Sequence, residues 1–230
     1  MNICVIPARG GSKRIQKKNI KNFCGKPIIF WSIEIAKASN CFDKVIVSTD
    51  DEKIATIARK YGAEVPFIRP KSISGDFAPT VPVISHAIKW LIQNYEKPLY
   101  VCCVYPTAPF IKLSDLRDGL KILKKTKFNY VFPVTNFAYP IQRSFKIDKN
   151  NKLKMFFSKY YHYRSQDLDE AFHDAGQFYW GKTEAWLNNK NIFSKNSFPM
   201  SVPRSRVLDI DTIEDWKIAE KMFKINNKKL

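Results

Sequence analysis

The sequence has little that would place it in a membrane or in an oxidising compartment. No apolar stretch in its 230 residues approaches the roughly 20 residues that a helix needs to cross a bilayer. Residues 1–7 show neither the basic segment nor the long apolar segment of a secretory signal. The five cysteines are odd in number and lack the spacing of metal ligands. We therefore expect a cytoplasmic protein with reduced cysteines and no membrane partner.

Several familiar motifs are absent as well. The chain contains no Walker A loop, no G-x-G-x-x-G fingerprint, and no Ser-His-Asp or Cys-His set. It also lacks a helix-turn-helix or an RNP aromatic motif, although its net charge of +18 is typical of proteins that contact nucleic acid. Because the lysines are spread over the whole length, we expect an enzyme with anionic substrates and no specific nucleic-acid partner. A nucleic-acid-binding protein is the alternative from another class.

Apolar runs that alternate with helical periodicity make up most of the chain, which is the pattern of βαβ units. This pattern predicts an α/β fold with a Rossmann-like, mostly parallel sheet flanked by helices. With 45% hydrophobic and 14% aromatic residues, the chain suits one ordered domain over residues 1–230. We expect Ser114 and Thr212 to cap helices, with Asp215 completing a capping box at the second. The expected strands are 3–6, 45–47, 64–68, 99–104, 130–134 and 177–180, and the expected helices are 28–38, 52–61, 81–94, 114–125 and 213–223.

Between residues 136 and 173 this alternation gives way to aromatic, polar and basic residues with short extended pieces. We interpret this stretch as an excursion from the sheet. The aromatic cluster at 160–163 and His173 are candidates for ligand contacts, but an interface or structural role is the favoured interpretation for the histidines.

The loop after the first expected strand is the most informative part of the chain. Residues 9–19 hold two adjacent glycines, a serine and five basic side chains. Glycines allow backbone N–H groups to turn toward one point, and such an amide cluster binds anions. Arg9, Lys13 and Lys18 can add charge and hydrogen-bond donors to the same anion. The position after a strand favours a nucleotide triphosphate site, with an ordinary solvated turn or a nucleic-acid contact as alternatives.

A second candidate site is Asp209-Ile210-Asp211. In extended backbone, two carboxylates one residue apart point to the same side. With Ile210 facing inward, the pair could hold Mg²⁺, which takes one or two carboxylates and completes its shell with phosphates and water. Alternatively, Asp211 only helps to cap the next helix and Asp209 is exposed, and the residues alone favour this second interpretation.

The basic loop resembles the amino-terminal motif of the CMP-sialic acid synthetases, the cytidylyltransferases that activate nonulosonic acids. That motif has the form I/L-x-A-R-x-x-S-K-x-I/L-x-x-K-N, and the chain matches it from Ile6 to Asn19. The resemblance implies a fold of the nucleotide-diphospho-sugar transferase type, with a protruding dimerisation segment at 136–173. It also implies transfer of CMP from CTP to the anomeric hydroxyl of a nonulosonic acid, with release of pyrophosphate.

The same resemblance implies roles for residues throughout the chain. In this family an arginine before a proline, here Arg69, contacts the nucleotide, and a small hydroxyl residue downstream, here Thr80, helps to read the cytosine edge. Asp209 and Asp211 match the family's metal-binding aspartates, so Mg²⁺ becomes the favoured interpretation of this pair. The implied nucleotide-binding set is Ala8, Arg9, Gly11, Ser12, Lys13, Lys18, Asn19, Arg69 and Thr80, and the implied catalytic set is Arg9, Lys18 and Asp211.

The positions that face the sugar depart from the family pattern. Tyr105 stands where the element Q-P-T-S-P-L/F has its glutamine, and His173-Asp174-Ala175 stands where the family has N-G-A. Arg164 resembles the arginine of an R-x-Q element, and its fork suits a sugar carboxylate. The implied sugar-binding residues are Tyr105, Thr107, Arg164, Gln177 and Tyr179.

Since the nucleotide positions match and the sugar positions differ, we expect the same chemistry on an acid other than N-acetylneuraminic acid. The elements 105–110 and 173–181 are similar to those of the pseudaminic acid branch of the family. The alternatives are N-acetylneuraminic acid, legionaminic acid or Kdo as the acceptor, or a nucleotidyltransferase acting on a phosphorylated polyol. The resemblance further implies a homodimer in which each 136–173 segment helps to wall the sugar pocket of the other subunit.

Overall fold

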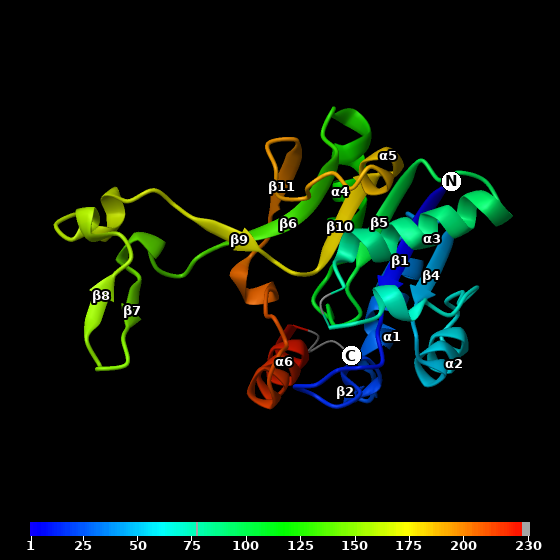
Figure 1. Cartoon of the computed structure of the whole chain (residues 1–230), viewed down its shortest axis with the longest axis horizontal. Coiled ribbons are helices and arrows are strands. Elements are labelled where there is room, and N and C mark those ends of the chain that lie inside the picture. Colours follow the sequence, from blue (N-terminus) through cyan, green and yellow to red (C-terminus); the bar gives the residue numbers. More distant parts are fainter. Residues whose placement is uncertain (77, 227–230) are drawn as a thin grey trace.

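A seven-stranded sheet forms the centre of the protein (Figure 1). The computed structural model describes residues 1–76 and 78–226. The strand order is β11, β6, β10, β5, β1, β4, and β9 pairs with the end of β6. The strands of this sheet are β1 (Asn2–Pro7), β4 (Lys44–Ser48), β5 (Tyr100–Val104), β6 (Tyr130–Asn136), β9 (Phe172–Asp174), β10 (Phe178–Lys182) and β11 (Ser197–Ser201).

Most of this sheet is parallel, as the sequence predicts. β1 runs parallel to β4 on one side and to β5 on the other, and β6 runs parallel to β11. β10 is antiparallel to both of its neighbours, β5 and β6, and β9 is antiparallel to β6. The carboxyl ends of β1, β4 and β5 therefore meet at one edge, which is where ligands of open α/β sheets bind.

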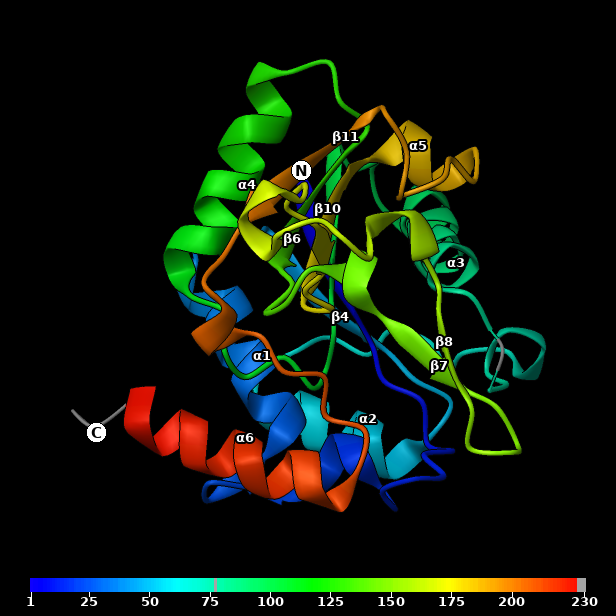
Figure 2. The ribbon, with the colours of Figure 1, turned by 90° about the vertical axis from the view of Figure 1, so that its left-hand side faces the viewer.

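Helices cover both faces of the sheet, and Figure 2 shows α4 and α3 on opposite sides of it. The helices α1, α2 and α4 share one hydrophobic core with the sheet, and α3 and α5 share the other. Alternation along β1 explains the two cores, because Cys4 and Ile6 face the first while Ile3 and Val5 face the second. The helices are α1 (Ile28–Ala38), α2 (Glu52–Lys60), α3 (Thr80–Asn94), α4 (Leu113–Lys125), α5 (Thr183–Leu187) and α6 (Ile213–Asn226).

The cysteines are free, and three of them are completely buried in β1 and β5. Burial raises the pKa of the Cys4 and Cys102 thiols, so both stay protonated and act as small apolar side chains.

A third hydrophobic cluster joins the carboxyl-terminal helix α6 to the chain that follows the basic loop. Here the short strands β2 (Asn22–Phe23) and β3 (Lys26–Pro27) form a hairpin. The ring of Phe23 meets that of Trp216 edge-on, with centroids 5.5 Å apart. The predicted capping box begins α6: the Thr212 amide donates to the Asp215 carboxylate at 2.7 Å, and the Asp215 amide donates to the Thr212 hydroxyl at 3.1 Å. Helix α6 is thereby packed against the segment that follows the basic loop.

The predicted strand at 64–68 is wrong. This segment only touches β4 at isolated bridges, Ile46 with Glu64 and Thr49 with Ile68. Pro66 lies between the two bridges and has no amide hydrogen to donate, so a continuous ladder cannot form.

The residue predicted to cap α4, Ser114, is also wrong. Ser114 lies inside α4, whose start is fixed because the Asp115 carboxylate accepts from the Lys112 amide at 2.8 Å.

Three short elements of the sheet region, α5, β9 and β11, were not predicted from the sequence. β11 carries the residues Ser-Phe-Pro-Met-Ser, which lack the apolar run of a buried strand.

An arm protrudes from the sheet between β6 and β9 (Figure 1). It carries the hairpin of β7 (Phe145–Ile147) and β8 (Leu153–Met155). Many of its large apolar side chains are exposed, including Tyr139, Ile147 and Tyr161. The chain therefore leaves the sheet over residues 137–171, whereas Asn136 and residues 172–173 at the two ends of the expected excursion belong to β6 and β9.

Among the described residues, no helix is long and apolar enough to span a bilayer. Single turns of 3-10 helix complete the secondary structure. These turns are Lys18–Ile20, Lys71–Ile73, Ile141–Arg143, Ser158–Tyr160, Ser165–Asp167 and Arg204–Arg206.

Substitution of Gly181 tests the packing of β10. A Cβ at this position would lie 2.3 Å from Trp186 Nε1 and 2.7 Å from Tyr130 Cε1, and both rings are fully buried. Gly181→Ala should lower the free energy of unfolding in urea by about 1–3 kcal/mol, the usual cost of overpacking a core. Gly75→Ala is the control, because its added methyl group meets nothing within 4 Å. Equal stability of the two variants would contradict this packing.

Candidate active site

A cavity of about 260 Å³ opens at the carboxyl ends of β1 and β5. Its lining combines the basic loop, the segment after residue 69, the start of α3 and the residues after β5. Residues from distant parts of the sequence, predicted to bind nucleotide or sugar, therefore meet here. Those that line the cavity are Arg9, Ser12, Lys13, Lys18, Asn19, Arg69, Thr80, Tyr105 and Thr107.

The basic loop is held in place by contacts to its own backbone and to the end of the chain. Asn19 is buried, and its side-chain amide donates to the Arg9 carbonyl at 2.9 Å. Lys18 Nζ donates to the Ile210 carbonyl at 2.6 Å. The loop therefore has a defined shape, which places Arg9 and Lys18 on the cavity wall.

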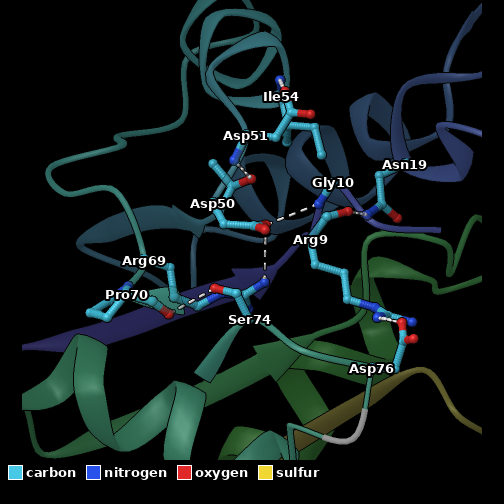
Figure 3. A network of polar contacts seen from close by, with 11 residues as sticks. Arg9, Gly10, Asn19, Asp50, Asp51, Ile54, Arg69, Pro70, Ser74 and Asp76 are labelled. Atoms are coloured by element: carbon cyan, nitrogen blue, oxygen red, sulfur yellow. Dashed lines mark hydrogen bonds and ion pairs between the residues drawn. The ribbon is translucent and has the colours of Figure 1, made fainter. Parts of the chain in front are cut away.

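Asp50 links the basic loop to Arg69, as Figure 3 shows. Its Oδ1 accepts from the Gly10 amide at 3.0 Å and lies 3.6 Å from Arg69 Nη2. Arg69 is only 4% exposed, and its Nε donates to the Ser74 hydroxyl at 3.2 Å. Burial lowers the pKa of Arg69, and the Asp50 carboxylate opposes that shift. Arg69 is thus a buried, paired arginine and not a surface side chain.

Gly10 has a role that differs from the one expected. Its amide is used by Asp50, and a Cβ on Gly10 would lie 2.8 Å from the Asp51 carboxylate. Gly10 therefore permits the close approach of the loop to the start of α2, where Asp51 accepts from the amides of Lys53 and Ile54. The sequence analysis did not predict a role for Asp50 in the site. Its position shortly after β4, at the carboxyl end of a parallel strand, could have indicated one.

Asp76 pairs with two cations of the basic loop, Arg9 and Lys13. Hydrogen bonds from Lys13 and Arg9 lower the pKa of the Asp76 carboxyl, so it is ionised at neutral pH. The two cations predicted to bind a triphosphate therefore already hold a carboxylate. An anionic ligand bound by the same two side chains must compete with Asp76.

The acid pair lies against the basic loop. Asp211 Oδ1 is 3.3 Å from Lys18 Nζ, and its Oδ2 is 2.6 Å from Arg14 Nη1. Ile210 between the acids is 1% exposed and packs in the third cluster, as the pattern predicts. Burial raises the pKa of Asp209, and the negative charge of Asp211 adds to that shift. The two carboxylates therefore repel one another, and a cation between them would relieve the repulsion.

The side of the cavity that is predicted to face the sugar is lined by Tyr105. The Tyr105 hydroxyl lies 3.0 Å from the Thr80 hydroxyl, and burial raises the pKa of Tyr105 to about 12. The ring of Tyr179 meets that of Tyr105 edge-on, with centroids 5.5 Å apart. Gln177 is buried and donates to the Arg206 carbonyl at 2.6 Å. Gln177 and Tyr179 thus lie behind the lining formed by Tyr105.

Seven predicted residues lie outside the cavity lining: Gln177, Tyr179, Asp209 and Asp211, described above, and Ala8, Gly11 and Arg164. Ala8 is buried in the core, where its amide donates to the Ser48 carbonyl at 2.9 Å, and Gly11 is exposed in the loop. Arg164 lies in the arm and pairs with Asp167 at 2.7 Å. Within one chain, Arg164 is therefore not brought to the cavity.

A cluster of cations at the carboxyl ends of parallel strands is typical of α/β enzymes that bind nucleotides. Residues 3–228 match the family model described as cytidylyltransferase, and the chain belongs to this family. The enzyme class predicted from the sequence is confirmed.

Individual relatives agree with this assignment. The pseudaminic acid cytidylyltransferase of Campylobacter jejuni is 46% identical over 226 residues, which cover 98% of this chain and 97% of that protein. The CMP-N,N'-diacetyllegionaminic acid synthase of Legionella pneumophila is 31% identical and covers 99% of this chain and 98% of its own length. A CMP:2-keto-3-deoxy-manno-octonic acid synthetase complexed with CTP superposes with a TM-score of 0.69 at 16% identity, over 100% of this chain and 99% of that one. This last likeness supports the predicted fold.

Removal of the Asp76 charge should strengthen anion binding. Asp76→Asn is expected to tighten the binding of inorganic tripolyphosphate by roughly two- to fivefold, a modest gain because the ion pairs are solvent-exposed. Isothermal titration calorimetry measures this affinity. Asp118→Asn is the control, because it changes the net charge equally on the exposed surface of α4. The competition is refuted if the two variants bind equally well.

Proposed function

We propose that this enzyme transfers CMP from CTP to the anomeric hydroxyl of pseudaminic acid and releases pyrophosphate. The observation that carries the cytidylyl transfer is the contact between Asp211 and Lys18, a basic-loop residue that lines the cavity, because this contact sets the acid pair beside the phosphate-binding residues. Pseudaminic acid is chosen as the acceptor because the chain is 46% identical to a pseudaminic acid cytidylyltransferase but only 31% identical to a CMP-N,N'-diacetyllegionaminic acid synthase. Free buried cysteines and the use of CTP fit a cytoplasmic enzyme.

The nucleotide end of the cavity is assigned to the basic loop and its neighbours. Ser12 and Lys13 hold the departing phosphates, and Ala8 and Gly11 shape the loop around them. Asn19, Arg69 and Thr80 serve the nucleoside side. Arg69 suits a fixed contact because its guanidinium is buried and held by Asp50 and Ser74.

Asp209 and Asp211 are proposed to hold Mg²⁺. Among the described residues, no group of three or more acidic, histidine or cysteine side chains could bind a metal alone. A pair of carboxylates nevertheless fits Mg²⁺, which completes its shell with phosphate oxygens and water. The bound ion would neutralise charge on the phosphates of CTP.

Catalysis by the chain is then mainly positioning and electrostatic stabilisation. The anomeric hydroxyl attacks the α-phosphorus in line and passes its proton to Asp209 or Asp211, the bond from that phosphorus to the β-phosphate oxygen breaks, and pyrophosphate leaves. Arg9 and Lys18 stabilise the negative charge that develops on the phosphoryl oxygens. Lys18 is suited to this role because its ammonium group is fixed by Ile210 and Asp211.

The arm is proposed to complete the sugar pocket of a second subunit in a homodimer. Arg164 lies on the arm with an exposed guanidinium, where it could bind the carboxylate of the acid in the neighbouring pocket. The exposed apolar side chains of the arm would be buried in such a dimer. Thr107, Tyr105, Gln177 and Tyr179 would form the remaining walls.

Pyrophosphate release tests the function directly. With CTP and Mg²⁺, the enzyme should release pyrophosphate fastest with pseudaminic acid, more slowly with N,N'-diacetyllegionaminic acid, and slowest with N-acetylneuraminic acid or Kdo. Coupled detection of phosphate after pyrophosphatase treatment measures the rates. Faster turnover of another acid would overturn the choice of sugar. Tight oligonucleotide binding at physiological salt, with no release from any acid, would favour a nucleic-acid-binding protein.

Substitution of Asp211 tests its catalytic role. Asp211→Ala should lower turnover at least about a hundredfold, the usual effect of losing a principal charge-stabilising group. The rate is measured at saturating CTP and Mg²⁺, with circular dichroism as the check on folding. Asp118→Asn should keep normal turnover. Near-normal turnover of Asp211→Ala would remove this residue from the mechanism.

Complementation tests the shared sugar pocket. Arg164→Ala and Asp211→Ala should each be nearly inactive alone. When they are co-expressed, half of the dimers are mixed and each has one intact site, so about a quarter of normal activity should return. Activity no higher than the mean of the two variants, or a fully active monomer in sedimentation velocity, would reject the shared pocket.

A further inference from the structure

The side chain of Tyr179 contacts both Tyr105 and Asp174, two positions at which the sequence departs from the family pattern. Tyr179 of β10 donates its hydroxyl hydrogen to the Asp174 carboxylate. Its ring packs edge-on against Tyr105 with centroids 5.5 Å apart. Two departures that are distant in the sequence are therefore joined through Tyr179.

The contacts of this group extend into the cavity. The Tyr179 hydroxyl has a single proton, which it donates to the Asp174 carboxylate. Beyond Tyr179, the Tyr105 hydroxyl lies 3.0 Å from that of Thr80. Tyr105 and Thr80 line the cavity, whereas Asp174 does not.

The surroundings keep the Tyr179 ring in place. Tyr179 is 3% exposed, and the ring of Phe132 packs against it with centroids 5.8 Å apart. Asp174 is fixed by the pairing of β9 with β6, where it lies opposite Val134 at the base of the arm. Within the described chain, the second carboxylate oxygen of Asp174 is buried without a hydrogen-bond partner. Such an arrangement is costly to folding and is therefore expected to serve function.

We propose that Asp174 is a positioning residue for acceptor selection, which acts through Tyr179 to fix the Tyr105 ring against the sugar end of the cavity. The proposal rests on the proposed function for its kinetic readout. Loss of the carboxylate frees the Tyr179 hydroxyl, and the Tyr105 ring loses its fixed neighbour. The site then binds CTP with unchanged affinity but binds the nonulosonic acid poorly.

Kinetics of three variants test the proposal. Asp174→Ala should raise the KM for pseudaminic acid at least about tenfold, since a buried hydrogen bond to a charged group is lost. The KM for CTP should stay within about twofold, because no cation of the basic loop is changed. Tyr179→Phe should reproduce the loss, and the double variant should be no worse than either single one, as expected for groups that act in series. Asp174→Asn, which keeps an acceptor oxygen, should recover much of the affinity.

Tyr130→Phe is the matched control. It also removes a buried tyrosine hydroxyl, which donates to the Lys190 carbonyl at 3.1 Å in the same core. This variant should keep the KM for the acid unchanged. Additive losses from Asp174→Ala and Tyr179→Phe, or an equal loss in Tyr130→Phe, would overturn the positioning role.

A second readout does not depend on the reaction. With 3-fluorotyrosine at position 105, the ¹⁹F resonance of the free enzyme should move in Asp174→Ala and in Tyr179→Phe, but not in Tyr130→Phe. An unmoved resonance in Asp174→Ala would reject the inference whichever acid is the substrate. A moved resonance in an enzyme that uses no nonulosonic acid would reject the proposed function alone.

Discussion

The ion pairs of Asp211 fasten the carboxyl-terminal segment to the basic loop near the amino terminus. Lys18 and Asp211 have side chains that are 19% and 27% exposed, so water screens this pair less than it screens a surface pair. The backbone reinforces the link, because Lys18 also donates to the Ile210 carbonyl and Ile210 is buried beneath the loop. The cations and the acids of the active site are therefore parts of one packed unit.

This arrangement has a consequence for binding. Four of the five cations of the loop are engaged by an acid: Arg9 and Lys13 by Asp76, and Arg14 and Lys18 by Asp211. The side chains are thus held near the cavity at little entropic cost when a ligand arrives, which is the advantage of preorganisation. The cost is competition, since a triphosphate must take over the cations that Asp76 holds.

The sequence predicts the parallel sheet well because apolar runs of strands buried on both faces differ sharply from helical periodicity. The sequence does not predict elements that depend on tertiary contacts. Pro66 interrupts the ladder of the expected strand at 64–68. β11 pairs with β6 although it alternates polar and apolar residues and lacks an apolar run. In the site, the motif predicts the basic loop, but the pairing of Asp50 with Gly10 and Arg69 depends on strand order. Arg164 is predicted to bind sugar, yet one chain alone leaves it on the arm.

The position of a divalent cation in a crystal with CTP tests the central claim most directly. Mn²⁺ can replace Mg²⁺ and is located by its anomalous scattering. The account predicts a peak bound by Asp209 or Asp211 and by a phosphate oxygen of CTP, with Lys18 contacting the same nucleotide. A nucleotide bound in the cavity with its cation held elsewhere, away from both acids, would contradict it.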